Sequence, residues 1–189
     1  MAFVGLLLIW PVLLIVAVAI RLDSPGPALF VQERVGLGER PFRMHKFRTM
    51  RVNAEAAGPQ VTASNDSRIT RTGAFLRRYK LDELPQLFDV LVGKMSLVGP
   101  RPEVPRYVAA WPAEARREIL SVRPGITDPM ALEYFDESAL LAQSSDPEHT
   151  YLHDVLPQKV QGYLRYVRNR SLALDVSVIL RTIKRAFHG

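Results

Sequence analysis

The sequence contains no cysteine among its 189 residues. Thiol nucleophiles, disulfide bonds and cysteine-ligated zinc sites are therefore excluded, and any chemistry must come from oxygen and nitrogen groups. The length fits one domain with a core of its own. Basic residues outnumber acidic ones, and the net charge of +6 predicts an anionic partner: a nucleic acid, a phospholipid headgroup or a phosphorylated small molecule.

Charge is also absent from the first twenty residues. Residues 2–20, AFVGLLLIWPVLLIVAVAI, approach the ~20 apolar residues that a membrane-spanning helix needs. A cleaved signal peptide is the competing interpretation, since residues 17–19 form a small-residue cleavage pattern, but no basic residue precedes the run. Arg21 and the basic residues that follow predict that the rest of the chain lies on the cytoplasmic side.

Pro11 stands in the middle of this apolar run. A proline removes one backbone hydrogen bond and clashes with the preceding turn, so we expect the helix to kink or break near residue 10. Each leg would then be about 15 Å long, roughly half the thickness of the hydrocarbon layer. The segment alone allows either a helix that enters and leaves by one membrane face or a spanning helix with a tolerated kink.

The rest of the chain predicts a small hairpin followed by helices. Strands are expected at 28–35 and 41–47, around a turn at 36–39 that lacks the third glycine and the helix of a phosphate-binding loop. Residues 52–70 are small and polar and predict a mobile loop. The proline-rich stretch 95–105 predicts irregular structure, and 122–129 predicts a rigid turn. Apolar spacing and stop signals predict helices from about 73, from 85 to Gly93, and over 113–121, 155–168 and 172–187.

The last of these helices is amphipathic. Its apolar side could face the core or lie on an anionic membrane surface. Upstream, His149 and His153 are four residues apart, a spacing that could hold a metal on a helix. The glutamate of the zincin pattern is missing and Pro147 lies just before them, so we favour a surface loop.

An acidic pair stands inside a basic cluster in the segment YKLDELPQ. Asp82 and Glu83 follow Arg77, Arg78 and Lys80. Because the next helix starts near residue 85, both carboxylates are expected at its N-terminus, where they can stay ionised beside anionic ligands. They could bind a divalent metal, act as a nucleophile, or only cap the helix and pair with the neighbouring cations. Capping is the commonest of these uses when the segment is taken alone.

Several further cations stand on stiff backbone. Lys46 and Arg48 lie in HKFRTM, Arg101 lies between two prolines, and Arg123 precedes another proline. Rigidly held arginines suit bidentate contacts to phosphate. These cations, the acidic pair and the membrane segment together predict phosphate chemistry at a bilayer surface.

At this point the chain resembles the bacterial sugar transferases, also called monotopic phosphoglycosyl transferases. The matching segments cover most of 21–182 in the family's order: LDSPGPALFVQERVG, FRMHKFRTM, LRRYKLDELPQLFDVLVGKMSLVGPRPE, VRPGIT and NRSLALDVSVILRT. The resemblance implies an α+β, mostly helical fold with surface amphipathic helices. It divides the chain into a re-entrant membrane helix over 1–21, broken at Pro11, and one compact catalytic domain over 22–189.

The resemblance also implies a reaction on the cytoplasmic face of a bacterial inner membrane. A phosphosugar passes from a UDP-sugar to a polyprenyl (undecaprenyl) phosphate, and UMP is released as surface glycan assembly begins. Asp82 is expected to become a covalent phosphosugar intermediate and Glu83 to bind Mg²⁺. Lys46, Arg77 and Arg101 match family positions near the phosphates or the metal. The resemblance also implies contact with inner-membrane phospholipids and allows a homodimer.

The chain departs from the family pattern in three places. Members begin with a basic and aromatic leader, which this chain is expected to lack, and many carry serine where Trp10 stands. The segment after Thr127 reads DPMALEYFDE instead of the usual Gly-Trp-Ala-Gln-Val. An aspartate that often precedes Tyr-Tyr-Val in the next helix has no evident match; Glu133, Asp136 and Asp154 could replace it, although ordinary surface roles are commoner for such residues.

Two rival functions come from other classes. A catalytically inert, membrane-tethered scaffold could use the same cations to bind anions within the glycan machinery. A nucleic-acid binder is disfavoured, because the aromatic residues do not alternate with the basic ones as a base-stacking platform requires. Substitution of Asp82 by asparagine separates an enzyme from a scaffold, since only the enzyme should lose turnover.

Overall fold

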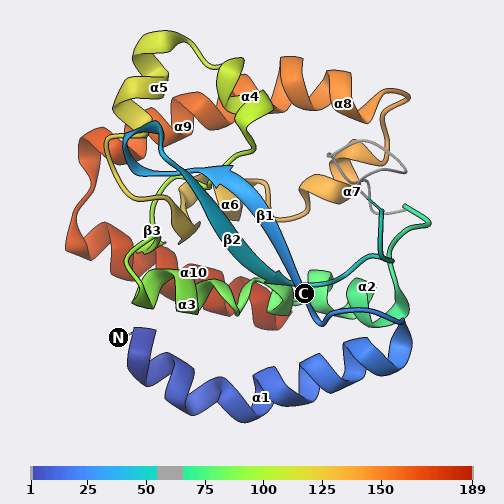
Figure 1. The fold of residues 1–189 in the computed structure, drawn as a ribbon. Helices are drawn as coiled ribbons and strands as arrows, with labels where there is room; N and C mark the ends of the chain where they lie inside the picture. The colour runs from blue at the N-terminus through green and yellow to red at the C-terminus, as the bar shows by residue number, and fades with distance from the viewer. Residues whose placement is uncertain (1, 55–65, 189) are drawn as a thin grey trace.

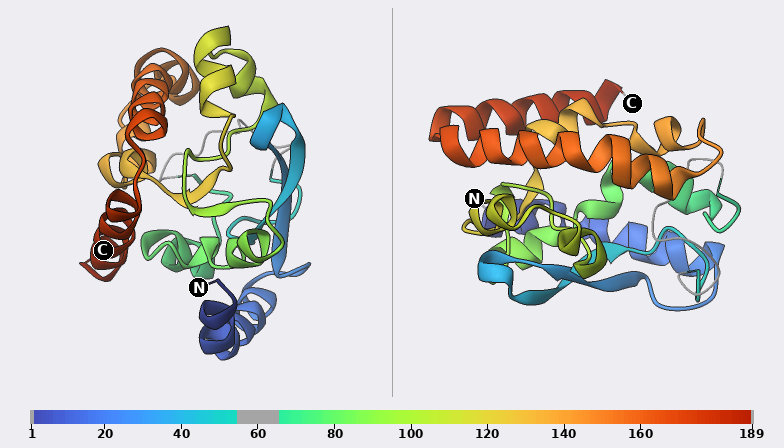
Figure 2. Two further views of the ribbon diagram at one scale, coloured as in Figure 1. Left: turned by 90° about the vertical axis from the view of Figure 1, so that its left-hand side faces the viewer. Right: turned by 90° about the horizontal axis from the view of Figure 1, so that it is seen from above.

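The computed structural model describes residues 2–54 and 66–188. The fold is α+β and mostly helical, as the sequence predicts (Figure 1). The two C-terminal helices lie on one side of the molecule, and a long hairpin lies on the opposite side (Figure 2). Most of the loop predicted over 52–70 lies outside the described residues.

The N-terminal helix α1, Ala2–Asp23, runs continuously through Pro11 and bends near its middle (Figure 1). Its residues Gly5–Asp23 are long and apolar enough to cross a membrane by length and composition. The helix lies along one side of the domain, against α2 (Arg71–Arg78) and α3 (Gln86–Leu91). Val16 and Ile20 are buried there against the domain. The predicted distortion at Pro11 is thus a bend within one helix.

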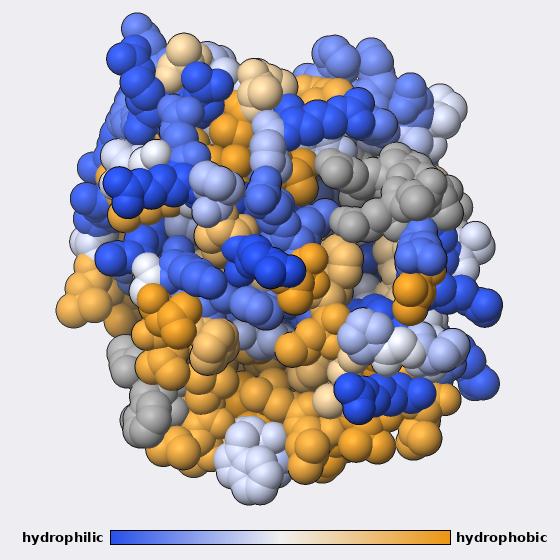
Figure 3. Space-filling model, in the orientation of Figure 1, coloured by the Kyte–Doolittle hydropathy of each residue, from blue (hydrophilic) through white to orange (hydrophobic). Residues whose placement is uncertain are grey.

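Most of α1 faces outward. Its exposed apolar side chains form a surface that we call the apolar base: Leu7, Leu8, Trp10, Val12, Leu14, Ile15 and Val18. In Figure 3 this lower part of the molecule is mostly hydrophobic, whereas the region above it is mixed and largely hydrophilic. An exposed apolar surface of this extent is typical of contact with a membrane or another protein.

The hairpin is confirmed nearly at its predicted bounds. Strand β1, Leu29–Val35, pairs antiparallel with β2, Pro41–Phe47, and Leu29 lies opposite Phe47. The turn contains one 3₁₀ segment, η1 (Leu37–Glu39), in which Gly38 adopts a φ of 62°. Glycine tolerates this left-handed conformation, which explains its place in the turn.

A second small sheet was not predicted. Strand β3, Ser96–Val98, pairs parallel with β4, Gly125–Thr127, so the predictions of irregular structure for the first segment and of a turn for the second were wrong for these residues. The two strands come from distant proline-rich segments, and no local periodicity reports their pairing. Close backbone contact explains two glycines here, because a Cβ added to Gly125 would lie 2.1 Å from the backbone nitrogen of Gly99.

The main core packs helices against the far end of the hairpin. Helix α9, Leu156–Asn169, contributes most of its buried face, and Tyr163 has 0% exposure at its centre. Helix α10, Leu172–His188, packs against β3 and β4. Both helices were predicted. The remaining helices are α4 Pro105–Ala109, α5 Ala113–Ile119, α6 Pro129–Glu133, α7 Glu137–Leu141 and α8 Pro147–Thr150, with π-helical turn η3 Tyr151–Val155.

The loop expected around His149 and His153 is instead helical. His149 lies in α8 and His153 in η3, and their exposed rings stack with centroids 4.1 Å apart. The cap explains why: the Asp146 carboxylate accepts a hydrogen bond from the backbone N–H of His149, and Pro147 occupies the first helical position. Within 2–54 and 66–188, no group of three or more His, Asp or Glu residues is arranged to hold a metal.

Candidate active site

The acidic pair lies in a short 3₁₀ turn of its own, η2, Leu81–Glu83. This turn joins α2 to α3, and Lys80 precedes it in a left-handed conformation with a φ of 55°. Pro85 then stands at the start of α3, as the sequence predicts. The turn therefore presents two adjacent carboxylates from rigid backbone, with Asp82 buried and Glu83 partly buried.

A polar pocket of about 420 Å³ opens above this turn. Its charged lining combines cations and carboxylates from all parts of the domain: Arg34, Lys46, Arg77, Arg78, Lys80, Arg101 and Lys159, with Asp82, Glu83, Glu103, Asp136 and Glu137. Of the seven charged site residues that the sequence predicted, the fold brings Lys46, Arg77, Arg101, Asp82 and Glu83 together here. Such an excess of cations around a carboxylate pair suits an anionic ligand.

Glu83 is held by two cations. Arg101 grips it as a fork, with one guanidinium nitrogen donating to Oε2 at 3.2 Å and the other donating to Oε1. Lys46 Nζ donates to Oε1 at 3.3 Å. Burial alone acts to raise the pKa of Glu83, but the charges of Arg101 and Lys46 outweigh it and hold that pKa well below its usual range. Glu83 is therefore a fixed negative charge at the pocket floor.

The environment of Asp82 differs from that of Glu83. Its Oδ1 is buried and has no hydrogen-bond partner among the described residues. Burial, reinforced by the charge of Glu83, raises the pKa of Asp82, while Lys46, Arg77 and Lys80 act in the opposite direction. An oxygen without a hydrogen bond keeps its lone pairs available, and a raised pKa makes the ionised carboxylate a stronger nucleophile.

Lys46 lies in strand β2 of the hairpin, and its side chain reaches this site. Its neighbour His45 fixes the strand to α3: the His45 backbone N–H donates to Asp89 Oδ2 at 2.9 Å, and the ring Nδ1 lies 2.8 Å from Oδ1. Asp89 is completely buried. Burial lowers the pKa of Lys46 to about 8. Arg77 approaches from α2, where its Nε donates to Thr49 Oγ1 at 2.8 Å.

Two predicted phosphate ligands lie elsewhere. The guanidinium of Arg48 is buried and donates to the carbonyl oxygens of Ser24 and Pro25, both at 2.8 Å, so it fastens the segment that follows α1. Arg123 is exposed, donates to the Gly93 carbonyl oxygen at 2.9 Å and lines a separate hollow beside β3. The sequence predicts that the backbone around these arginines is rigid, but it does not predict the direction in which their side chains point.

A network of charged residues in the wall of the pocket was not predicted from the sequence. Lys159 Nζ donates to Glu137 Oε2 at 2.7 Å and lies 3.7 Å from Glu103 Oε1. Glu103 also accepts a hydrogen bond from the Tyr151 hydroxyl at 2.6 Å and pairs with Arg34 at 3.5 Å. Lys159 falls among Leu156, Val160 and Tyr163 on the apolar face of its helix, and that position could have revealed a buried lysine.

Of the three acidic candidates for the missing aspartate, only Asp136 lines the pocket, and Arg185 pairs with it at 3.3 Å. Glu133 and Asp154 are exposed and do not line the pocket. The buried carboxylate of the altered segment is Asp128, which caps α6 by accepting backbone hydrogen bonds from Met130 and Ala131. Burial raises the pKa of Asp128 to about 6.

The acidic pair fits a divalent cation that is shared with a ligand. Mg²⁺ is usually held by one or two carboxylates together with substrate phosphates and water, rather than by an all-protein cage. Asp82 Oδ1 is without a partner among the described residues, and the three donors on Glu83 leave part of its acceptor capacity unused. The donor set is thus compatible with Mg²⁺ only when phosphates complete the shell.

Comparison with known proteins agrees with this geometry. The chain matches the family model described as "Bacterial sugar transferase" over residues 1–189, and it belongs to that family. It is 38% identical, over its whole length, to the UDP-N-acetylgalactosamine-undecaprenyl-phosphate N-acetylgalactosaminephosphotransferase of Aeromonas hydrophila. Over 98% of its length it is 39% identical to the UDP-glucose:undecaprenyl-phosphate glucose-1-phosphate transferase of Xanthomonas campestris pv. campestris.

A third relative is the UDP-glucose:undecaprenyl-phosphate glucose-1-phosphate transferase of Caulobacter vibrioides, which is 41% identical over 92% of this chain. The matched region covers 42%, 37% and 61% of the Aeromonas, Xanthomonas and Caulobacter proteins respectively. The chain thus corresponds to part of each relative.

Proposed function

We propose that this protein transfers a phosphosugar from a UDP-sugar to a membrane polyprenyl phosphate, and that Asp82 carries the phosphosugar between the two substrates. The observation that carries the proposal is Asp82 itself: a buried carboxylate with an unpartnered Oδ1 in a pocket rich in cations. Family membership supports the reaction class, because relatives are named for the transfer of a sugar phosphate to undecaprenyl phosphate.

In the first half-reaction, the Asp82 carboxylate attacks the phosphorus next to the sugar. A new oxygen–phosphorus bond forms as the bond to the bridging oxygen breaks, and UMP leaves with that electron pair. Arg77, Lys80 and Arg101 neutralise the phosphate oxygens, because a carboxylate is otherwise repelled by the dianionic diphosphate. Mg²⁺ held by Glu83 and the phosphates would add positive charge there.

In the second half-reaction, a phosphate oxygen of the lipid attacks the same phosphorus. The bond to Asp82 breaks, the carboxylate is released, and the product is a polyprenyl diphosphate sugar. A covalent intermediate lets one pocket serve a water-soluble donor first and a lipid acceptor second.

The membrane arrangement follows from α1. Because the helix lies along the domain and bends at Pro11, we propose that it dips into the cytoplasmic leaflet and returns to the same face. The apolar base would face the hydrocarbon layer and phospholipid tails, while Arg21 and the basic domain stay on the cytoplasmic side. This arrangement holds the acidic pair near headgroup height, where the acceptor phosphate lies.

The test is intact-protein mass spectrometry of detergent-solubilised protein incubated with Mg²⁺ and a panel of UDP-sugars. We expect a mass increase of one phosphosugar that polyprenyl phosphate removes and that is absent from Asp82→Asn. A parent protein that forms no adduct and releases no UMP, even with acceptor present, would overturn the proposal.

A further inference from the structure

A second cavity of about 480 Å³ adjoins the polar pocket, and its lining is mostly apolar. Its walls come from α3, the β3–β4 sheet and α10, including Leu84, Leu87, Leu97, Ile126, Ile179 and Ile183. The size is in the ~300–1,000 Å³ range of small-molecule sites. A cavity of this kind attracts an apolar chain and not a charged nucleotide.

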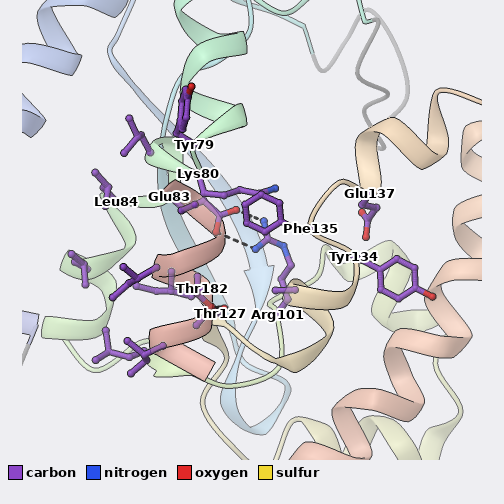
Figure 4. Close-up of a pocket in the computed structure, with 18 of the residues that line it drawn as sticks. Tyr79, Lys80, Glu83, Leu84, Arg101, Thr127, Tyr134, Phe135, Glu137 and Thr182 are labelled. Carbon is purple, nitrogen blue, oxygen red and sulfur yellow. Dashed lines mark hydrogen bonds and ion pairs between the residues drawn. The ribbon is translucent and has the colours of Figure 1, made fainter. Parts of the chain in front are cut away.

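The two cavities meet at a group of charged residues. Glu83, Arg101 and Lys159 line both of them. Phe135 also lines both and is buried between Lys80, whose Nζ lies 4.8 Å from the ring centroid, and Arg185, at 5.2 Å. Figure 4 shows Phe135 beside the Glu83–Arg101 pair. A ligand with an anionic end and an apolar chain could therefore place its charge at the cations while its chain fills the second cavity.

Helix α10 forms one wall of this apolar cavity. Ile179, Ile183 and Ala186 point toward it at helical spacing, and Thr182 anchors the helix through a 2.7 Å hydrogen bond to Thr127. Near the end of the helix, Arg185 pairs with Asp136 at 3.3 Å. These contacts hold α10 against the rest of the domain, so the cavity has a fixed shape.

One wall of the cavity also packs against the apolar N-terminal helix. Leu87 lines the cavity and lies against α1, since a Cβ added to Gly5 would be 3.9 Å from Leu87 Cδ1. Figure 2 shows the C-terminal end of α10 beside α2 and α3, and these two helices lie above α1. The apolar lining of the cavity therefore adjoins the helix that we place in the membrane.

We propose that the cavity binds the isoprenoid units nearest the phosphate of the acceptor lipid and that α10 thereby selects a prenyl phosphate over water-soluble phosphates. The inference rests on the proposed function for the identity of the acceptor. Phe135 is assigned as the partition that keeps the chain on the apolar side while the phosphate reaches Arg101. The polar pocket remains free for the nucleotide sugar.

The experiment narrows the cavity from its α10 wall. Ala186→Trp adds bulk to the lining, Ala186→Leu adds less, and Ala173→Trp places the same indole on an exposed position of α10 outside the cavity. Adduct formation with the UDP-sugar and its discharge by polyprenyl phosphate are measured separately. We expect Ala186→Trp to form the adduct at the parent rate but to raise the acceptor KM by about tenfold or more, with Ala186→Leu intermediate and Ala173→Trp like the parent.

Direct binding makes the test independent of turnover. Native mass spectrometry of Asp82→Asn with polyprenyl phosphate should show about tenfold weaker binding once Ala186→Trp is added and no change with Ala173→Trp. Equal binding and discharge in all variants would overturn the inference, and loss of adduct formation alone would assign the cavity to the donor. If the unsubstituted protein forms no adduct but the lipid-binding differences between the variants are as expected, only the proposed function is contradicted.

Discussion

Arg101 and Glu83 form a two-pronged ion pair between the loop after β3 and the turn η2. The two residues are 18 positions apart in the sequence. Their ion pair connects the proline-rich segment around Arg101 to the turn that carries Asp82 and Glu83. The charge of Glu83 raises the pKa of Arg101 well above its usual value, so the guanidinium stays charged at any working pH. The pair therefore fixes both the shape and the charge of the pocket floor.

Arg101→Lys tests that geometry, because it keeps the charge but removes the planar fork. We expect the rate of adduct formation to fall on the order of 10²-fold, since Glu83 and the phosphates lose an aligned donor. The rate is measured by the release of UMP. Arg168→Lys is the matched control, because Arg168 makes a similar forked pair with Glu118 on the surface; equal losses in both variants would contradict a role for the fork in the site.

Removal of divalent metal should abolish adduct formation. EDTA is expected to stop UMP release completely, and added Mg²⁺ should restore it. In Glu83→Gln we expect a higher Mg²⁺ concentration for half-maximal rate, because an amide is a weaker ligand than a carboxylate. Full activity in EDTA, or an unchanged Mg²⁺ requirement in Glu83→Gln, would count against the metal role assigned to Glu83.

The buried carboxyl of Asp128 should make the free energy of unfolding depend on pH. Burial raises its pKa to about 6 in the folded chain, against 3.8 for the unperturbed group, so the folded state binds more protons between these values. Asp128 therefore lowers the free energy of unfolding progressively as pH rises from about 4 to 6, by on the order of 2–3 kcal/mol. Asp128→Asn keeps a helix cap and removes this loss.

The measurement is the difference in melting temperature between Asp128→Asn and the parent as a function of pH. We expect the variant to gain relative to the parent from pH 4 to 6 and the difference to be constant above that range. A difference that does not change with pH would show that the carboxyl titrates normally.

Lys159 should matter to stability more than a surface lysine does. Its side chain is 4% exposed and its ammonium lies between Glu137 and Glu103, so Lys159→Met removes one of the two cations on the buried Glu103 and the ion-pair partner of Glu137. We expect a loss of about 3 kcal/mol in unfolding free energy, observed as a lower melting temperature, and partial recovery when Glu137→Gln is added. Lys94→Met, at an exposed position, should change little.

Pro11 should determine the path of α1 through the membrane. Because the chain has no cysteine, a single Ala2→Cys provides a unique thiol for labelling. In intact cells, an impermeant maleimide should leave this thiol unlabelled if the helix returns to the cytoplasmic face. Pro11→Leu, which allows a straight helix, is expected to expose it at the outer face; labelling of the parent at that face would contradict the re-entrant arrangement.

The sequence by itself determined the elements that depend on local patterns. The apolar run of α1, the hairpin, the helix after Pro85 and the amphipathic α9 and α10 follow from periodicity and from proline and glycine signals, which act within a few residues. The grouping of Asp82 and Glu83 with cations was also predictable, because both carboxylates stand within a basic segment of the sequence.

Only the tertiary structure decided which cations face those carboxylates. Arg48 and Arg101 both stand on stiff backbone in the sequence, yet Arg48 turns toward the carbonyl oxygens of Ser24 and Pro25, and Arg101 turns toward Glu83. The parallel pairing of β3 with β4, the burial of Lys159 and the junction of the polar and apolar cavities likewise join residues far apart in the chain. Side-chain direction and long-range pairing depend on packing of the whole domain, which no short window of sequence contains.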